Sequence, residues 1–85
     1  MEISDAWLIN QLAHSVGFEA AEKIITDVVR RAGFHRKPEY TKEEFRCICK
    51  ILKEKGGLTK IFATIIEKVV YQEKYYQTII EEERR

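Results

Sequence analysis

Residues 58–83 read LTKIFATIIEKVVYQEKYYQTIIEEE, and this stretch decides how the rest of the chain must be arranged. Its apolar side chains recur in alternating steps of four and three residues, which is the pattern of an α-helix that packs along one seam. The pattern predicts one helix over 58–83. At about 1.5 Å of rise per residue, such a helix is roughly 39 Å long, whereas a compact globule of this chain length is about 30 Å across.

The far end of this helix is therefore expected to project beyond the domain. We predict that residues 71–85 form a projecting dimerisation segment, because its aromatic and aliphatic side chains need a second surface to cover them. The same helix of a second copy is the simplest cover, and the tyrosines are of the residue type enriched at interfaces. The predicted interface residues are Tyr71, Gln72, Tyr75, Tyr76, Ile79 and Ile80.

The apolar seam is wide. If Leu58 occupies a heptad d position, apolar residues also fall at the flanking e and g positions, which a simple two-stranded zipper keeps charged. This width favours a homodimeric bundle, in which Gln72 helps to set the register. A different protein partner and a closed monomer, with the helix folded back onto its own domain, are the alternatives.

Three further helices are predicted before this one, over residues 5–16, 18–32 and 42–55. Ser4 or Asp5 can cap the first helix, and Gly17 ends it. Thr41 and Glu44 form a T-x-x-E capping box at the start of the third. We expect an all-α, four-helix domain spanning residues 1–85, without strands, in which the first three helices pack around the front half of the fourth.

Composition supports a folded domain but gives no bulk attraction to a charged partner. The chain of 85 residues is 45% hydrophobic, and its 15 basic and 14 acidic side chains leave a formal net charge of +1. Such a chain is too apolar to be disordered and too nearly neutral to be drawn as a whole to nucleic acid.

The charges are nevertheless unevenly distributed. Residues 30–60 contain ten lysines and arginines against four glutamates, which is a footprint that nucleic-acid-binding proteins share. No Asn or Gln in this segment could read a base edge, and three of the glutamates lie in the predicted third helix. A solvated helix face is therefore the alternative. The candidate nucleic-acid-binding residues are Arg30, Arg31, Arg36, Lys37, Lys42, Arg46 and Lys50.

Catalytic and metal-binding patterns are not recognisable. His14 and His35 belong to no metal-ligand motif, and the only cysteines, Cys47 and Cys49, cannot bridge one another within a helix. Cys49 falls on the apolar stripe and Cys47 off it. We expect no enzyme activity, no cofactor and no metal, and a cytoplasmic setting without membrane insertion.

The function that the sequence favours is a non-catalytic interaction or regulatory module that self-associates through its C-terminal helix. A small nucleic-acid-binding regulator that uses the basic segment 30–60 is the alternative. The two hypotheses differ in the surface that they require to be exposed.

Overall fold

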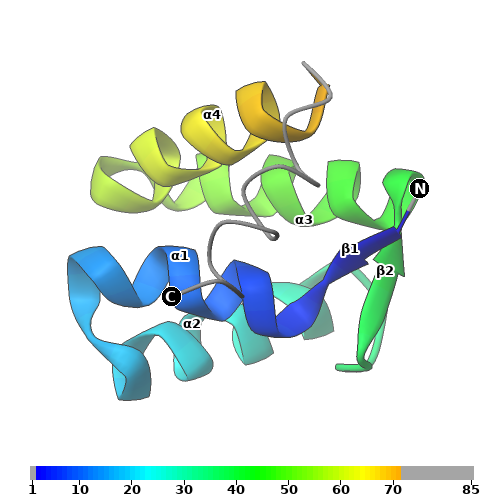
Figure 1. Ribbon diagram of the computed structural model, residues 1–85, viewed down its shortest axis with the longest axis horizontal. Coiled ribbons are helices and arrows are strands. Elements are labelled where there is room, and N and C mark those ends of the chain that lie inside the picture. The colour runs from blue at the N-terminus through cyan, green and yellow to red at the C-terminus, as the bar shows by residue number, and fades with distance from the viewer. Residues whose placement is uncertain (1, 72–85) are drawn as a thin grey trace, which may run out of the picture.

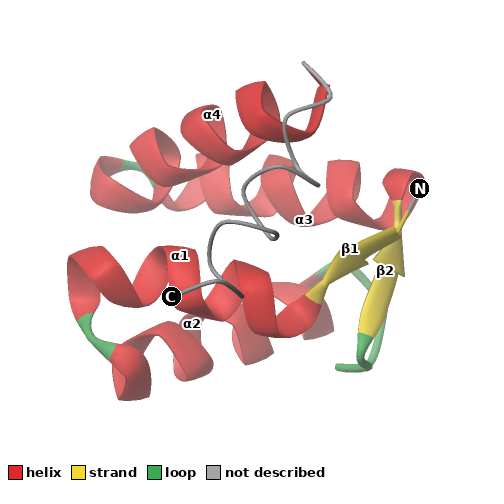
Figure 2. Ribbon diagram, in the orientation of Figure 1, coloured by secondary structure: helices red, strands yellow, loops and turns green. Residues whose placement is uncertain are grey.

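The computed structural model describes residues 2–71, which form four helices and a two-stranded sheet (Figures 1 and 2). In chain order the elements are β1 (Glu2–Ser4), α1 (Asp5–Val16), α2 (Phe18–Arg31), β2 (Glu39–Thr41), α3 (Lys42–Lys55) and α4 (Gly57–Tyr71). The mainly helical fold is as predicted. The predicted helix bounds agree within one residue for the first three helices, and α4 begins one residue earlier than expected.

The starts of α1 and α3 are set by side-chain caps that the sequence predicts. The hydroxyl of Ser4 accepts a 3.2 Å hydrogen bond from the backbone N–H of Trp7 in the first turn of α1. At α3, the Glu44 backbone N–H donates to Thr41 Oγ1, and the Thr41 backbone N–H donates to Glu44 Oε1 at 2.8 Å. Both halves of the capping box are therefore present, and the expected start at Lys42 is confirmed.

A single glycine joins α1 to α2. Gly17 has a φ of +86°, a conformation that side chains with a Cβ rarely adopt, and its N–H donates to the Ala13 carbonyl at 2.8 Å. The chain therefore reverses within one residue, so that α1 and α2 lie side by side in one layer (Figure 1).

The expectation that the chain has no strand is wrong. β1 and β2 pair antiparallel, with Ile3 opposite Tyr40, and both of these side chains are fully buried. Each strand has three residues and sends one side chain inward, so neither shows the longer alternation by which a strand is recognised in a sequence. The sheet joins the start of α1 to the start of α3 at one end of the domain (Figure 2).

The helices form two layers, with α1 and α2 in one and α3 and α4 in the other (Figure 1). The core lies between these layers and against the sheet. It includes Trp7, Leu8 and Leu12 from α1, Ile25, Val28 and Val29 from α2, Phe45, Ile48 and Leu52 from α3, and Phe62, Ile66 and Val70 from α4.

The predicted central position of the front half of the last helix is also wrong. α4 packs mainly against α3, and only the face with Phe62, Ala63, Ile66 and Val70 is buried. The sequence makes α4 apolar nearly all round, but one helix neighbour covers only part of that circumference. The remainder of the predicted helix, 72–83, lies outside the described residues.

Candidate interaction surfaces

One side of α4 carries a row of exposed aliphatic side chains. Leu58, Ile61 and Ile65 are 62%, 57% and 56% exposed, and their spacing of three and four residues places them on one face of the helix. We call these three residues the apolar row. Single exposed aliphatic residues are ordinary, but a contiguous row along a helix is the kind of surface that proteins use for association.

The apolar row borders a shallow groove between α4 and α1. The groove has a volume of about 220 Å³ and is lined by the apolar row with Phe62 and Ile66, and by Gln11 and Ser15 across from it. This space is below the several hundred cubic ångströms of a usual small-molecule pocket, but it suits a few side chains of another helix. The sequence did not indicate that Gln11 and Ser15 of α1 would border an apolar groove.

Tyr71, the one predicted interface residue within the described part, lies away from the apolar row. Its ring meets that of Phe45 edge-on, with 6.1 Å between centroids, and the ammonium of Lys42 is 5.6 Å from the ring centre. Both neighbours belong to α3, whereas the apolar row faces the groove beside α1. The other predicted interface residues, Gln72, Tyr75, Tyr76, Ile79 and Ile80, lie outside the described residues.

Two of the seven candidate nucleic-acid-binding residues share one carboxylate. Arg30 and Arg31 lie 3.3 and 3.2 Å from the oxygens of Asp27, which also receives Lys55 from α3 at 2.9 Å. The hydrogen bond from Lys55 is the main reason why the pKa of Asp27 falls below its ordinary value. These cations already have an anionic partner, so they are less available to bind a phosphate.

Arg36 and Lys37 are paired as well. Arg36 Nη2 lies 2.7 Å from Asp5 Oδ2, and its Nη1 lies 3.6 Å from Glu22. Lys37 forms an ion pair with Glu44, and this hydrogen bond is the main cause of the lowered pKa of Glu44. Four of the seven candidates are therefore already paired with carboxylates, and the pairs of Arg36 and Lys37 also join the loop after α2 to neighbouring helices.

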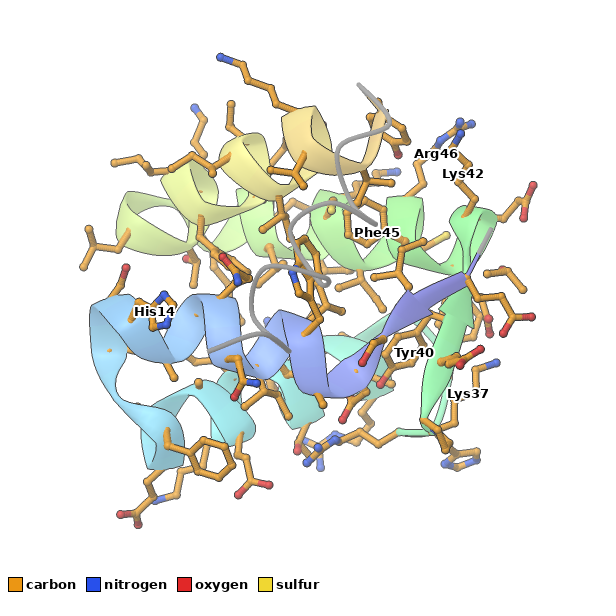
Figure 3. The ribbon with its side chains drawn as sticks, viewed as in Figure 1. His14, Lys37, Tyr40, Lys42, Phe45 and Arg46 are labelled. Atoms are coloured by element: carbon orange, nitrogen blue, oxygen red, sulfur yellow. The ribbon has the colours of Figure 1, made fainter. Side chains whose placement is uncertain are left out.

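The other three candidates remain exposed on α3. Lys42, Arg46 and Lys50 follow one another at steps of four residues, and none forms an ion pair with a carboxylate in residues 2–71. Figure 3 shows Lys42 and Arg46 projecting together from the first half of α3. We call these three residues the basic row.

Tyr71, the last residue of α4, lies beside the basic row of α3. A shallow depression beside it is lined by Arg46, Lys50, Lys53, Glu67 and Tyr71. Hydrogen bonding to the Tyr71 hydroxyl raises the pKa of Arg46, while Lys53 is paired with Glu67 at 2.9 Å. The depression thus brings Arg46 and Lys50, which form no ion pair with a carboxylate of residues 2–71, beside the aromatic side chain of Tyr71. The sequence did not indicate that Tyr71 would lie beside these cations.

The cysteines occupy the environments that the sequence predicts. Cys47 is exposed, whereas Cys49 is buried in the core, where desolvation raises the pKa of its thiol strongly. His14 and His35 are both exposed. Within residues 2–71, no cluster of three or more His, Cys, Asp or Glu side chains could hold a metal ion. Across the same residues, every helix is too short or too polar to cross a membrane.

Comparisons with protein-family models, with curated proteins and with solved structures found no match for this chain. The apolar row and the basic row are therefore the features from which a function can be inferred.

Proposed function

We propose that this protein is a non-catalytic interaction module that self-associates through its C-terminal helix, and that the apolar row of α4 is part of the contact surface. The single observation that carries this proposal is the exposure of more than half of each of Leu58, Ile61 and Ile65 along one helix face. Burying such side chains against another copy gains about 1.5–3 kcal/mol for each one that is fully covered.

The row alone is too short for a stable interface. From Leu58 to Ile65 the helix rises by only about 10 Å, while a stable dimer buries about 800 Å² on each partner. In the sequence, Gln72 and Ile79 follow Ile65 at steps of seven residues, so the predicted interface continues the same heptad position. The exposed row and the predicted segment together would supply an interface of sufficient length.

A two-fold arrangement suits these features best. In a symmetric dimer the same patch meets itself, so one apolar row can supply both sides of the contact. Antiparallel or crossed α4 helices would place the aliphatic side chains of each copy against the groove beside α1 of the other. The dimer would then present its remaining surface to another macromolecule.

The test is the molar mass of the full chain in solution, measured by light scattering after size-exclusion chromatography. We expect the wild type to be dimeric and Ile65→Asp to be monomeric, because a charge in the row cannot be desolvated without a partner. Thr64→Asp is the matched control, since it adds the same charge at the adjacent exposed position and should remain dimeric. A monomeric wild type at high concentration, or an unchanged mass for Ile65→Asp, contradicts the proposal.

A further inference from the structure

We propose that the exposed face of α3 binds single-stranded nucleic acid, with the basic row contacting phosphates and Tyr71 stacking against a base. This surface is separate from the apolar row, and the proposal assigns Tyr71, which the sequence predicts to be an interface residue, to the nucleic acid instead.

The arrangement of the cations favours a linear polyanion. Lys42, Arg46 and Lys50 recur at each turn of α3, about 6 Å apart along the axis, so the row extends over roughly 12 Å. A small anion needs donors that converge on one point, whereas these three donors are strung along a helix. Nucleic-acid phosphates are also strung along a line, and guanidinium groups match their geometry well.

The remaining charges on this face leave the row available. Glu43 and Glu54 lie on the same helix, and Glu43 is close enough to contribute to the raised pKa of Arg46. Glu67, which faces the row from α4, is already paired with Lys53. Within α3, Lys53 and Lys55 are paired, and the three residues of the basic row are thus the cations of this helix that form no ion pair with a carboxylate of residues 2–71.

Tyr71 favours a single strand over a duplex. Tyr71 is 38% exposed, its ring meets that of Phe45 edge-on, and it lines the same depression as Arg46 and Lys50. Unpaired bases can stack on such a ring, whereas bases within a duplex cannot reach it. With no Asn or Gln between residues 30 and 60, we expect little sequence preference.

The proposal is tested by fluorescence anisotropy with a labelled oligothymidylate and the full chain over a series of salt concentrations. Three phosphate contacts on a single strand predict a slope of about −2 in log affinity against log salt. Arg46→Gln with Lys50→Gln should reduce this slope to about −0.7. The matched control is Lys60→Gln with Lys68→Gln, which removes two exposed cations from α4 and should leave the slope unchanged.

Tyr71 is tested separately. Tyr71→Ala should weaken binding about fivefold or more, while Tyr71→Phe should bind as the wild type does, because stacking requires the ring and not the hydroxyl. Thermal unfolding shows whether each variant is folded. The salt slope tests the phosphate contacts of the basic row independently, whatever the outcome for Tyr71→Ala.

Four results would overturn the proposal. The first is no binding of the oligonucleotide at low salt. The second is equal binding of a duplex with no effect at Tyr71, which would show a general polyanion surface. The third is an equal reduction of the salt slope in the control variant Lys60→Gln with Lys68→Gln, which would show that the oligonucleotide is attracted only by the net charge of the protein. Preferential binding of polyglutamate would likewise assign the face to an acidic peptide instead.

Discussion

The hydroxyl of Tyr40 donates a 2.6 Å hydrogen bond to Oδ1 of Asp5, and so ties β2 to the first residue of α1. The other carboxylate oxygen of Asp5 accepts a 2.7 Å hydrogen bond from Arg36. Burial and the neighbouring Asp5 carboxylate both raise the pKa of Tyr40. The Asp5 carboxylate therefore connects α1, the loop after α2 and β2. Tyr40 is labelled in Figure 3.

Loss of the Tyr40 hydroxyl should weaken the domain. Tyr40→Phe keeps the buried ring but removes a donor to a charged acceptor, so we expect the free energy of unfolding to fall by about 1.5–3 kcal/mol. Urea denaturation of the full chain measures this change. The control is Tyr71→Phe, whose hydroxyl is at the surface and should matter much less; equal losses in the two variants would contradict the role assigned to Tyr40.

The α3 capping box should contribute measurably to stability. Thr41→Ala leaves the backbone N–H of Glu44 without its 3.2 Å acceptor, and loss of such a cap typically costs about 1 kcal/mol. Thr64→Ala is the control, because that hydroxyl donates to the Lys60 carbonyl within an exposed turn of α4. We expect chemical denaturation to show a loss for Thr41→Ala and little change for Thr64→Ala.

Asp27 should make stability depend on pH in the acid range. Its pKa is lowered in the folded protein, chiefly by the hydrogen bond from Lys55, so its ionised form stabilises the fold. This contribution is complete above the unfolded-state pKa of about 3.9 and is lost as the pH falls through the lower folded-state value. Asp27→Asn should therefore be less stable than the wild type at pH 7. Urea denaturation at several pH values should show the difference in stability between the two proteins shrinking as the pH falls below about 3.9; a constant difference would refute the linkage.

The two cysteines should differ sharply in reactivity. The exposed Cys47 thiol should react quickly with a disulfide reagent, whereas Cys49 is buried and its pKa is raised, so it should react only on unfolding. The rapid phase should disappear in Cys47→Ser and remain in Cys49→Ser. A rapid phase that persists in Cys47→Ser would place Cys49 at the surface.

The predicted dimerisation segment has its own test, independent of the apolar row. Tyr76→Asp combined with Ile79→Asp should yield a stable monomer by light scattering, because two charges would enter the predicted seam. If these substitutions leave the mass unchanged while Ile65→Asp dissociates the dimer, the interface is confined to the apolar row and its neighbours.

Local sequence signals account for most of the helix bounds. Ser4, Gly17 and the pair Thr41 and Glu44 each act within a few residues, so their effect can be predicted without knowledge of the fold. The strands could not be predicted in this way. Ile3 and Tyr40 are buried because they meet across the sheet, and a three-residue strand contains no periodicity from which that pairing follows.

The candidate surfaces were only partly predictable. Periodicity showed that α4 is apolar over a wide face, but not that α3 would cover one side and leave Ile61 and Ile65 exposed. Composition showed a basic segment, but not that Arg36 would pair with Asp5, 31 residues earlier in the chain. Both outcomes depend on contacts between residues distant in sequence, which are fixed only when the helices pack.

The pairing of β1 with β2 has a consequence for synthesis on the ribosome. Ile3 is made before α1 and α2, yet its partner Tyr40 emerges only after both of these helices are complete. The nascent helical hairpin must therefore wait for translation to reach the second strand before Ile3 and Asp5 can take their final neighbours. During that interval a chaperone or a protease would meet an apolar surface that the finished protein conceals.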